Sequence, residues 1–316
     1  MKILITESST LISNNDLSLG VFDTLGDTVI YENISREKLL EEVKNAEVIL
    51  CNKVLINREV IDSAPNLKYV GLFATGYNNI DIDYAKEKGI CVCNVAGYST
   101  NAVAQQVMGY ILMQYTKIPE YNSFVKNDGW KNSPTFSALV YPSAELAGKT
   151  LGIIGYGSIG KAVEKAASGL EMNVIVYTRT PKENTSTTFV GFEELLQKSD
   201  IITVHCPLNN ESANLFNKES FSKCKKGAFF INTSRGGVVD EQALLEALES
   251  GILSGAAVDV LKTEPMAETC LLSNAPNLIV TPHTAWAPLE TRKRLVKLVA
   301  ENLSAFLKGE PVNSLT

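Results

Sequence analysis

Histidine is the scarcest acid–base side chain in this sequence. The 316 residues contain only two, His205 and His283. Because histidine is the usual side chain for proton transfer near neutral pH, any imidazole-based chemistry of this chain has only these two candidates.

Long apolar runs and basic runs are also missing. No apolar stretch reaches the ~18 residues that a membrane-spanning helix needs. The formal net charge is −6, and no basic run with interleaved aromatic residues occurs, which argues against a nucleic-acid surface. We therefore expect neither a membrane nor a nucleic acid as a partner.

The six cysteines are scattered and form no metal-binding pattern. Cys91 and Cys93 stand too close together for the usual ligand spacing, and no cysteine–histidine cluster occurs, so we expect no metal site. The N-terminal apolar run meets Glu7 too early for a signal peptide. We therefore expect reduced, mostly buried thiols in a cytoplasmic protein.

What the sequence does contain is a glycine pattern near its middle. An apolar run stops at Gly155, and Gly157 and Gly160 follow with the spacing G-x-G-x-x-G. A helical pattern and a second strand at 173–177 complete a strand–helix–strand unit. In such a unit the glycines permit a tight turn, the approach of a pyrophosphate and close helix packing, although a purely structural turn is the alternative. The candidate phosphate-binding residues are Gly155, Tyr156, Gly157, Ser158, Ile159 and Gly160.

Strands and helices alternate on both sides of this unit. Continuous apolar strands between helices indicate parallel sheets covered on both faces, and the length suits about two domains. We therefore expect an α/β protein with two doubly wound parallel-sheet domains. Residues 119–142 show little periodicity, and we expect a loop there that serves as an oligomer arm. The predicted strands lie at 3–6, 46–51, 67–74, 90–94, 201–205, 228–232, 255–258 and 278–280.

Polar residues follow two strands of the first half, at the edge where parallel sheets bind ligands. Asn52 follows one strand, and Ala74, Thr75 and Gly76 follow the next. These residues are candidates for substrate binding, and a simple turn at Thr75-Gly76 is the alternative.

Both histidines, one arginine and one glutamate lie just past strands of the second half. Arg235 offers a rigid fork of donors that suits a carboxylate, and Glu264 precedes a proline that restricts the local backbone. A carboxylate against an imidazole favours the charged ring and fixes its tautomer. Arg235, Glu264 and a histidine therefore form a candidate acid–base set. A surface charge and a structural histidine are the alternatives.

Over essentially its full length, the sequence resembles the D-isomer-specific 2-hydroxyacid dehydrogenase family. The resemblance rests on segments that match in order, spacing and content. They are 71–81, 94–100, 155–160, 205–208, 232–237, 257–260 with 264–265, and 281–283.

This resemblance implies roles for individual residues. Arg235 would bind the substrate carboxylate and carbonyl, while Glu264 would pair with His283, the residue that transfers the proton. Besides the glycine segment, the implied cofactor-binding residues are His205, Cys206 and Pro207 on the adenosine side, Thr233, Ser234, and Asp259 at the nicotinamide carboxamide. The implied substrate-binding residues are Asn52, Ala74, Thr75, Gly76, Arg235 and Trp286.

The resemblance also implies a domain organisation. Residues 1–98 plus 287–316 would form a discontinuous, flavodoxin-like substrate domain, and residues 99–286 would form a Rossmann NAD(P)-binding domain. An active site in the cleft between these domains and a homodimer through the nucleotide domain are further implications.

Within the family, Trp286 and the segment 97–100 are similar to glycerate dehydrogenases, or hydroxypyruvate reductases. The implied substrate is a small 2-oxo acid such as hydroxypyruvate or glyoxylate, reduced to the D-2-hydroxy acid. Two alternatives stay open: a nucleotide-sensing, corepressor-like binding protein, and a phosphoglycerate-, formate- or phosphite-type dehydrogenase on the same fold.

The sequence departs from the NAD-binding pattern at one point. Thr178 stands where an acidic residue would hydrogen-bond the ribose hydroxyls of NAD, and Arg179 follows it. Without that carboxylate a 2′-phosphate is not repelled, and Arg179 is suited to pair with it. We expect NAD or NADP as the cofactor and favour NADP. An Arg179 that points to solvent is the alternative.

Overall fold

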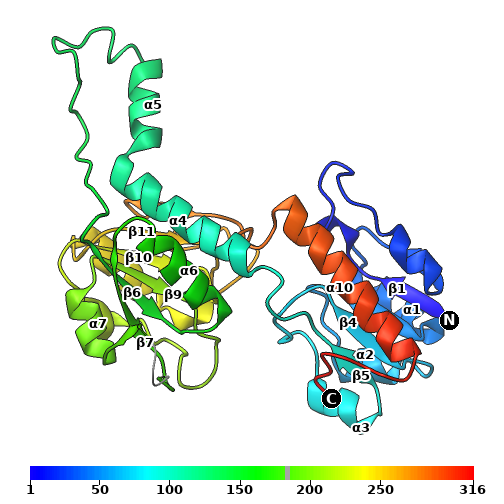
Figure 1. Ribbon diagram of the computed structural model, residues 1–316. Helices are drawn as coiled ribbons and strands as arrows, with labels where there is room; N and C mark the ends of the chain where they lie inside the picture. The colour runs from blue at the N-terminus through cyan, green and yellow to red at the C-terminus, as the bar shows by residue number, and fades with distance from the viewer. Residues whose placement is uncertain (182–185) are drawn as a thin grey trace. The chain divides into compact units, whose positions relative to one another are not determined.

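The chain divides into two compact units. The computed structural model describes residues 1–181 and 186–316. Unit 1 comprises Met1–Ser99 and Ala287–Thr316, and unit 2 comprises Thr100–Trp286. Each unit is built on one sheet in which all neighbouring strands are parallel (Figure 1). The predicted α/β class with two parallel sheets is therefore confirmed.

Unit 1 contains a five-stranded sheet in the order β2-β1-β3-β4-β5, which is the flavodoxin-like order. β3 and β4 are buried along their whole length, and this burial explains why both segments are continuous apolar runs. The strands are β1 (Lys2–Ile5), β2 (Asp27–Ile30), β3 (Val48–Cys51), β4 (Tyr69–Leu72) and β5 (Cys91–Cys93). The α-helices are α1 (Arg36–Glu42), α2 (Arg58–Asp62), α3 (Ile82–Glu87) and α10 (Leu289–Leu307).

The helix α10 belongs to unit 1 although unit 2 separates it from the rest of that unit in the sequence. Arg292 of α10 forms an ion pair with Asp16 at 2.6 Å, and its hydrogen bond lowers the pKa of Asp16 to about 2. Asn302 donates to the carbonyl of Asn94 at 3.0 Å. Polar contacts therefore tie both halves of α10 to the N-terminal segment.

Unit 2 contains a seven-stranded sheet in the order β12-β11-β10-β9-β6-β7-β8. The chain enters this sheet at the interior strand β6, adds β7 and β8 on one side, and then crosses to β9 on the other side, as in dinucleotide-binding folds. The strands are β6 (Thr150–Ile154), β7 (Asn173–Tyr177), β8 (Thr188–Phe189), β9 (Ile201–Val204), β10 (Ala228–Asn232), β11 (Leu253–Val258) and β12 (Leu278–Val280). The α-helices are α4 (Thr100–Thr116), α5 (Ile118–Lys126), α6 (Ser158–Ser168), α7 (Phe192–Lys198), α8 (Lys218–Ser222) and α9 (Glu241–Glu249).

Residues 118–142, called the arm below, begin with a helix that the sequence analysis did not predict. The expectation of a loop was wrong for α5, because its short pattern has no buried face: none of its residues is buried. Lys117 has a left-handed φ of 57° and separates α5 from α4, and Pro119 lies in the first turn of α5. Within unit 2, α5 and the strand-free segment after it extend away from the sheet (Figure 1).

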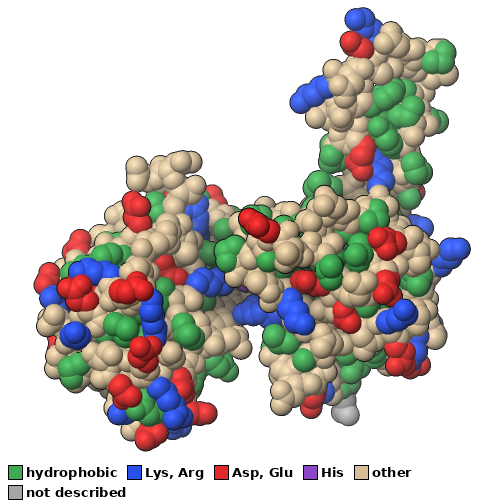
Figure 2. Space-filling view, turned by 180° about the vertical axis from the view of Figure 1, so that it is seen from behind, with side chains coloured by type: hydrophobic (Ala, Val, Ile, Leu, Met, Phe, Trp, Pro, Cys, Tyr) green, Lys and Arg blue, Asp and Glu red, His purple; other side chains and the backbone are tan. Residues whose placement is uncertain are grey.

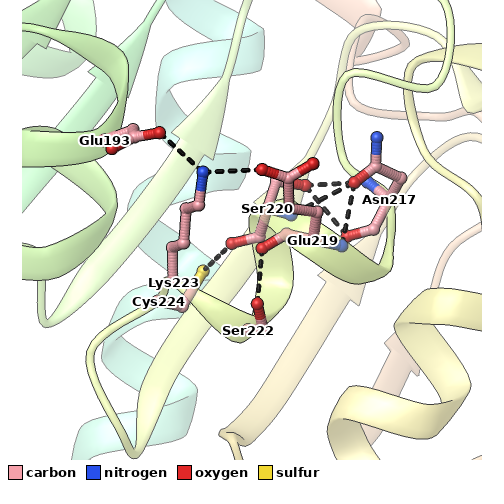
Figure 3. Close-up of polar contacts among 7 residues, drawn as sticks. All are labelled: Glu193, Asn217, Glu219, Ser220, Ser222, Lys223 and Cys224. Atoms are coloured by element: carbon pink, nitrogen blue, oxygen red, sulfur yellow. Dashed lines mark hydrogen bonds and ion pairs between the residues drawn. The ribbon is translucent and has the colours of Figure 1, made fainter.

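A local network joins α7 to α8, a short helix that the sequence pattern also did not predict. The Asn217 side chain accepts the backbone N–H groups of Glu219 and Ser220 at 3.0 and 3.1 Å, which caps α8. Lys223 then bridges Glu219 at 2.8 Å and Glu193 of α7 at 2.6 Å (Figure 3). These contacts fix the start of α8 and its position beside α7.

Candidate active site

The glycine turn between β6 and α6 has a separate physical reason for each glycine. Gly155 has a φ of 90°, and a Cβ there would lie 2.6 Å from the backbone nitrogen of Cys206. A Cβ on Gly160 would lie 2.4 Å from the carbonyl oxygen of Gly155. At Gly157, by contrast, a Cβ would meet no atom of the described chain within 4 Å. Two glycines therefore permit tight packing, and the third keeps open space at the start of α6.

This open space fits a dinucleotide pyrophosphate. Gly157 is the N-cap of α6 and gives the helix no side-chain cap. The first backbone N–H groups of the helix and its positive dipole end therefore lie beside the space that a side chain at Gly157 would fill. The hydroxyl of Tyr156 bonds Glu164 and also lies 2.8 Å from the hydroxyl of Thr187. These bonds hold the ring alongside α6.

The end of β7 lies directly beside the glycine turn, because the backbone N–H of Gly155 donates to the carbonyl of Tyr177 at 2.9 Å. Thr178 and Arg179 follow Tyr177. Arg179 forms an ion pair with Glu211, a residue of the segment after β9. The Arg179 side chain is nevertheless 70% exposed, and its pairing with a 2′-phosphate stays a prediction.

His205 follows β9 and is held as a neutral ring. Its backbone N–H donates to the carbonyl of Ile154 at 2.7 Å. Its ring nitrogens lie 3.0 Å from the hydroxyl of Thr203 and 3.5 Å from that of Thr233. Burial lowers the pKa of His205 to about 3, because the interior disfavours the charged ring. At neutral pH this imidazole therefore has no proton to give as an imidazolium.

The loop that carries Arg235 is shaped by its neighbours. The Asn232 side chain accepts from the backbone N–H and the hydroxyl of Ser234 and donates to the carbonyl of Arg235 at 3.0 Å. A Cβ on Gly236 would lie 2.0 Å from the backbone of Leu261. The Arg235 loop therefore packs against the loop that leads to Glu264. Arg235 itself is half-buried, and its Nη1 donates to the carbonyl of Ser234 at 2.7 Å.

His283 and Glu264 form a direct pair. His283 Nδ1 lies 2.6 Å from Glu264 Oε2, and the other oxygen, Oε1, accepts the backbone N–H of Leu261 at 2.9 Å. Because an ionised carboxylate can only accept, Nδ1 is the donor, which fixes the tautomer and leaves Nε2 as the nitrogen that can exchange a proton. Both side chains are partly exposed, at 24% and 34%. Among the residues that the structure describes, His283 is the histidine that pairs with a carboxylate.

Asp259 follows β11 and holds the turn that carries His283. This carboxylate is 2% exposed. One oxygen accepts the hydroxyl of Thr281 at 2.5 Å and the backbone N–H of Thr284 at 2.9 Å, and the other accepts the backbone N–H of Ala285 at 2.9 Å. The backbone N–H of His283 donates to the carbonyl of Asp259 at 2.8 Å. Asp259, considered from the sequence only as a cofactor ligand, thus supports the turn that carries His283.

In unit 1, the loop after β3 is clamped by a buried carboxylate. Glu7 is 4% exposed and accepts the backbone N–H groups of Asn52, Lys53 and Val54 at 2.5–3.3 Å. Asn79 donates to the carbonyls of Asn52 and Val54 at 3.3 and 2.8 Å. The sequence analysis did not propose a site role for Glu7, although a charged residue just past β1, at the carboxyl edge of the sheet, is a usable signal.

The loop after β4, the neighbour of β3 in the sheet, is fastened in the same way. The backbone N–H of Val95 donates to the carbonyl of Ala74 at 3.0 Å, and the Thr75 hydroxyl donates back to the Val95 carbonyl at 2.7 Å. The Asn94 side chain donates to the carbonyl of Thr75 at 2.7 Å. The candidate residues of unit 1, Asn52 and Ala74–Gly76, therefore lie on two rigid loops at one edge of one sheet.

The predicted site residues divide between the units. Unit 2 brings together the Arg235 loop, Glu264, Asp259 and His283, and it also carries the glycine turn, Thr233 and Cys206. Trp286 is its last residue and is half-buried. Pro207 lies on the segment after β9, where its carbonyl accepts the Ser212 hydroxyl at 2.6 Å.

Residues 1–181 and 186–316 contain no group of three or more His, Cys, Asp or Glu side chains arranged to hold a metal ion. Every helix in the same residues is too short or too polar to cross a bilayer.

Known proteins resemble this chain in both sequence and structure. Residues 108–285 match the family described as "D-isomer specific 2-hydroxyacid dehydrogenase, NAD binding domain". A protein of Blautia hydrogenotrophica named hydroxypyruvate reductase is 40% identical, and the match covers 99% of each sequence.

Two solved structures are similar to this chain over nearly its whole length. The D-lactate dehydrogenase of Aquifex aeolicus, complexed with NAD and lactic acid, matches with a TM-score of 0.84 at 28% identity, over 98% of this chain and 96% of that one. An NADPH-dependent glyoxylate/hydroxypyruvate reductase of Sinorhizobium meliloti, in complex with NADP and malonate, also matches with a TM-score of 0.84, at 27% identity, over 100% of this chain and 96% of that one.

Proposed function

Because the chain belongs to the D-isomer specific 2-hydroxyacid dehydrogenase family, we propose that it reduces a small 2-oxo acid to the D-2-hydroxy acid with a nicotinamide cofactor. The observation that carries this proposal is the pair of His283 and Glu264, 2.6 Å apart, together with the packing of the loop that leads to Glu264 against the Arg235 loop. Hydroxypyruvate and glyoxylate are the proposed substrates, since the relative of highest identity quoted above is named hydroxypyruvate reductase.

In the proposed reaction, each residue of the acid–base set has one task. The bound nicotinamide supplies the hydride, and the protein residues bind, orient and protonate the oxo acid. The Arg235 guanidinium binds the carboxylate and polarises the carbonyl oxygen, where negative charge develops. The Nε2–H of protonated His283 gives its proton to that oxygen, and the Glu264 carboxylate stabilises the charged ring.

The other histidine is a poor candidate for this role. A His205 ring with a pKa of about 3 is neutral at pH 7 and has no proton to give as an imidazolium. Its place after β9, with its backbone bonded to the end of β6, instead supports a role in lining the cofactor site together with Cys206 and Pro207.

For the cofactor, we propose that the glycine turn and the N-terminus of α6 hold the pyrophosphate. We further propose NADP in preference to NAD, since Thr178 gives no carboxylate to repel a 2′-phosphate and Arg179 gives a cation to pair with it. The ion pair with Glu211 opposes this preference, because the phosphate and Glu211 would compete for the same guanidinium. The preference for NADPH over NADH therefore depends on how much more strongly Arg179 binds the 2′-phosphate than Glu211.

We also assign substrate binding to residues outside the acid–base set. In unit 1, the clamped loops of Asn52 and of Ala74–Gly76 are suited to hydrogen-bond the oxo acid through fixed backbone groups, so we assign substrate binding to this unit. Trp286 supplies a bulky side chain that favours small over branched oxo acids.

The decisive experiment is a substrate panel with purified protein, NADH and NADPH. Hydroxypyruvate, glyoxylate, pyruvate and a branched 2-oxo acid are measured in the reducing direction, and 3-phosphoglycerate, formate and phosphite in the oxidising direction. Turnover of hydroxypyruvate or glyoxylate that is lost in His283→Ala supports the proposal. Nucleotide binding without turnover of any substrate favours a corepressor-like protein, and oxidation of formate or phosphite favours the other dehydrogenases.

We also propose a homodimer formed through the arm. Six large apolar side chains of the arm are exposed, among them Phe136 at 93% and Leu139 at 89%, and exposed apolar side chains that gather in one patch mark an interaction site. Figure 2 shows hydrophobic side chains gathered along the arm. Light scattering of the wild type and of Phe136→Ser/Leu139→Ser tests the proposal, which fails if both have the same mass. The cytoplasmic location expected from the sequence stays a prediction.

A further inference from the structure

A chain of hydrogen bonds runs from α4 to the turn that carries His283. The hydroxyl of Tyr110, on α4, lies 2.5 Å from the hydroxyl of Thr281, and Thr281 lies 2.5 Å from a carboxylate oxygen of Asp259. Tyr110 and Asp259 are each 2% exposed, and Thr281 between them is partly exposed. None of the proposed steps of the reaction uses Tyr110.

The direction of these bonds follows from the number of protons. A threonine hydroxyl has one hydrogen, and an ionised carboxylate has none, so Thr281 must donate to Asp259. The same hydroxyl can then only accept from Tyr110, which makes Tyr110 the donor. Burial raises the pKa of Tyr110, and the side chain of Gln106, one turn earlier on α4, forms a further hydrogen bond with it. Tyr110 therefore keeps the proton that it donates.

The receiving end of the chain is the support of the proton-transfer turn. The Asp259 carboxylate accepts the backbone N–H groups of Thr284 and Ala285, on the C-terminal side of His283. His283 has a φ of 55°, a left-handed conformation that is unfavourable for a non-glycine residue. Such a conformation persists only where surrounding contacts enforce it, and the contacts to Asp259 do so here.

We propose that Tyr110 is a positioning residue for His283, acting through Thr281 and Asp259. The Tyr110 hydroxyl orients the Thr281 hydroxyl toward Asp259, and the oriented carboxylate fixes the backbone on which the imidazole stands. In this arrangement α4 contributes to proton transfer without touching the reacting atoms. The part of the test that measures activity rests on the proposed function, whereas the spectroscopic part does not.

The activity test uses Tyr110→Phe, which removes one hydroxyl and keeps the ring. The loss of one neutral hydrogen bond predicts a fall in kcat of about 2- to 12-fold, with little change in the KM for the cofactor. Thr281→Val removes this bond and also the charge-assisted bond to Asp259, so it should give a larger fall. Thr281→Ser should retain activity, and Tyr110→Phe/Thr281→Val should be no worse than Thr281→Val alone, because the bonds act in series. Tyr115→Phe, the same change on the same helix, is the matched control and should leave kcat unchanged.

The spectroscopic test uses the fact that the chain has only two histidines. Protein labelled with 13C at the histidine Cε1 atoms gives two ring signals, which a His283→Asn variant assigns. Tyr110→Phe should move or broaden the signal of His283 and leave that of His205 in place, while Tyr115→Phe should move neither.

These outcomes separate the inference from its rivals. A Tyr110→Phe protein with an unchanged His283 signal and unchanged kcat overturns the inference. A Tyr110→Phe protein that is only less stable to denaturant, with the His283 signal in place, also overturns it, because Tyr110 is then a structural residue. If the wild type reduces no 2-oxo acid, the proposed function fails, and the histidine signals still decide the positioning role.

Discussion

The ion pair of Arg179 and Glu211 allows the cofactor preference to be tested with a single substitution. Glu211→Gln keeps the shape of the side chain and removes its charge. Arg179 should then be free to bind a 2′-phosphate, and a negative charge near that phosphate is lost. The affinity of the protein for NADPH should rise, and its affinity for NADH should change little.

The exposure of the pair limits the size of the effect. Arg179 and Glu211 are 70% and 68% exposed, and an ion pair of this kind contributes about 0.2–1 kcal/mol. The expected gain for NADPH in Glu211→Gln is therefore about 1.4- to 5-fold. A charge-assisted bond from Arg179 to the phosphate is stronger and contributes about 1.5–3 kcal/mol when it is shielded from water. Because Arg179 is exposed, we expect a contribution near about 1.5 kcal/mol. Arg179→Ala should therefore lower the affinity for NADPH by about tenfold.

Calorimetric titration with 2′,5′-ADP and with 5′-AMP, which differ only by the 2′-phosphate, measures this difference without turnover. The ratio of kcat/KM for NADPH to that for NADH gives the same comparison during catalysis. Thr178→Asp should shift both measurements toward the ligand without the 2′-phosphate. Glu193→Gln removes a carboxylate from another exposed ion pair, with Lys223, and serves as the control. A ratio that is far below one in the wild type and unmoved by Arg179→Ala would refute the reasoning, because Arg179 would then have no contact with the phosphate.

Four further predictions concern the reaction and the fold. His283→Ala should lower kcat by about 10²- to 10⁴-fold while nucleotide binding, followed by calorimetry, survives; an unchanged kcat removes His283 from the mechanism. Arg235→Lys replaces a planar fork by a point charge, so KM for the oxo acid should rise and kcat should fall, and near-normal kcat/KM would contradict the clamp role. Hydroxypyruvate or glyoxylate should have a higher kcat/KM than a branched 2-oxo acid, and the reverse order would argue against a pocket narrowed by Trp286. His205 has a pKa of about 3 in the folded protein against an ordinary value of 6.5, so the unfolded chain binds the extra proton between these values. The free energy of unfolding should therefore fall as pH drops from about 6.5 toward 3, and denaturant titrations should show a weaker fall in His205→Gln; an equal fall in both proteins would mean that His205 is not the cause.

The fold was largely predictable because both sheets are parallel and buried. Strands such as β3 and β9 are buried at every position, and a parallel sheet covered on both faces produces this continuous apolar pattern. The elements that were missed are short or exposed. β2 has no buried residue, β8 has two residues, and α5 has no buried face, so none of them has a pattern strong enough to detect.

The candidate residues of the site could be predicted from the sequence, but the residues that support them could not. Arg235, Glu264 and His283 were predicted as candidates because they follow strands and match the family's segments. The supporting residues were not found, because their partners are remote in the sequence. Tyr110 and Thr281 are separated by 171 positions, and Glu7 lies 45 positions before Asn52. Neither composition nor periodicity relates residues so far apart, and only the folded chain brings them within hydrogen-bonding distance.

The placement of α10 has a consequence for the order in which the chain folds during synthesis. Unit 2 is one continuous segment of 187 residues, from Thr100 to Trp286, and all of it leaves the ribosome before α10 does. At about 5–20 residues per second, the N-terminal segment waits roughly 10–40 s for the helix whose arginine pairs with Asp16. During this interval the first unit lacks the cover that α10 provides, and its apolar surface is open to chaperones and proteases. The nucleotide-binding unit, although second in the sequence, is therefore the first that can be completed.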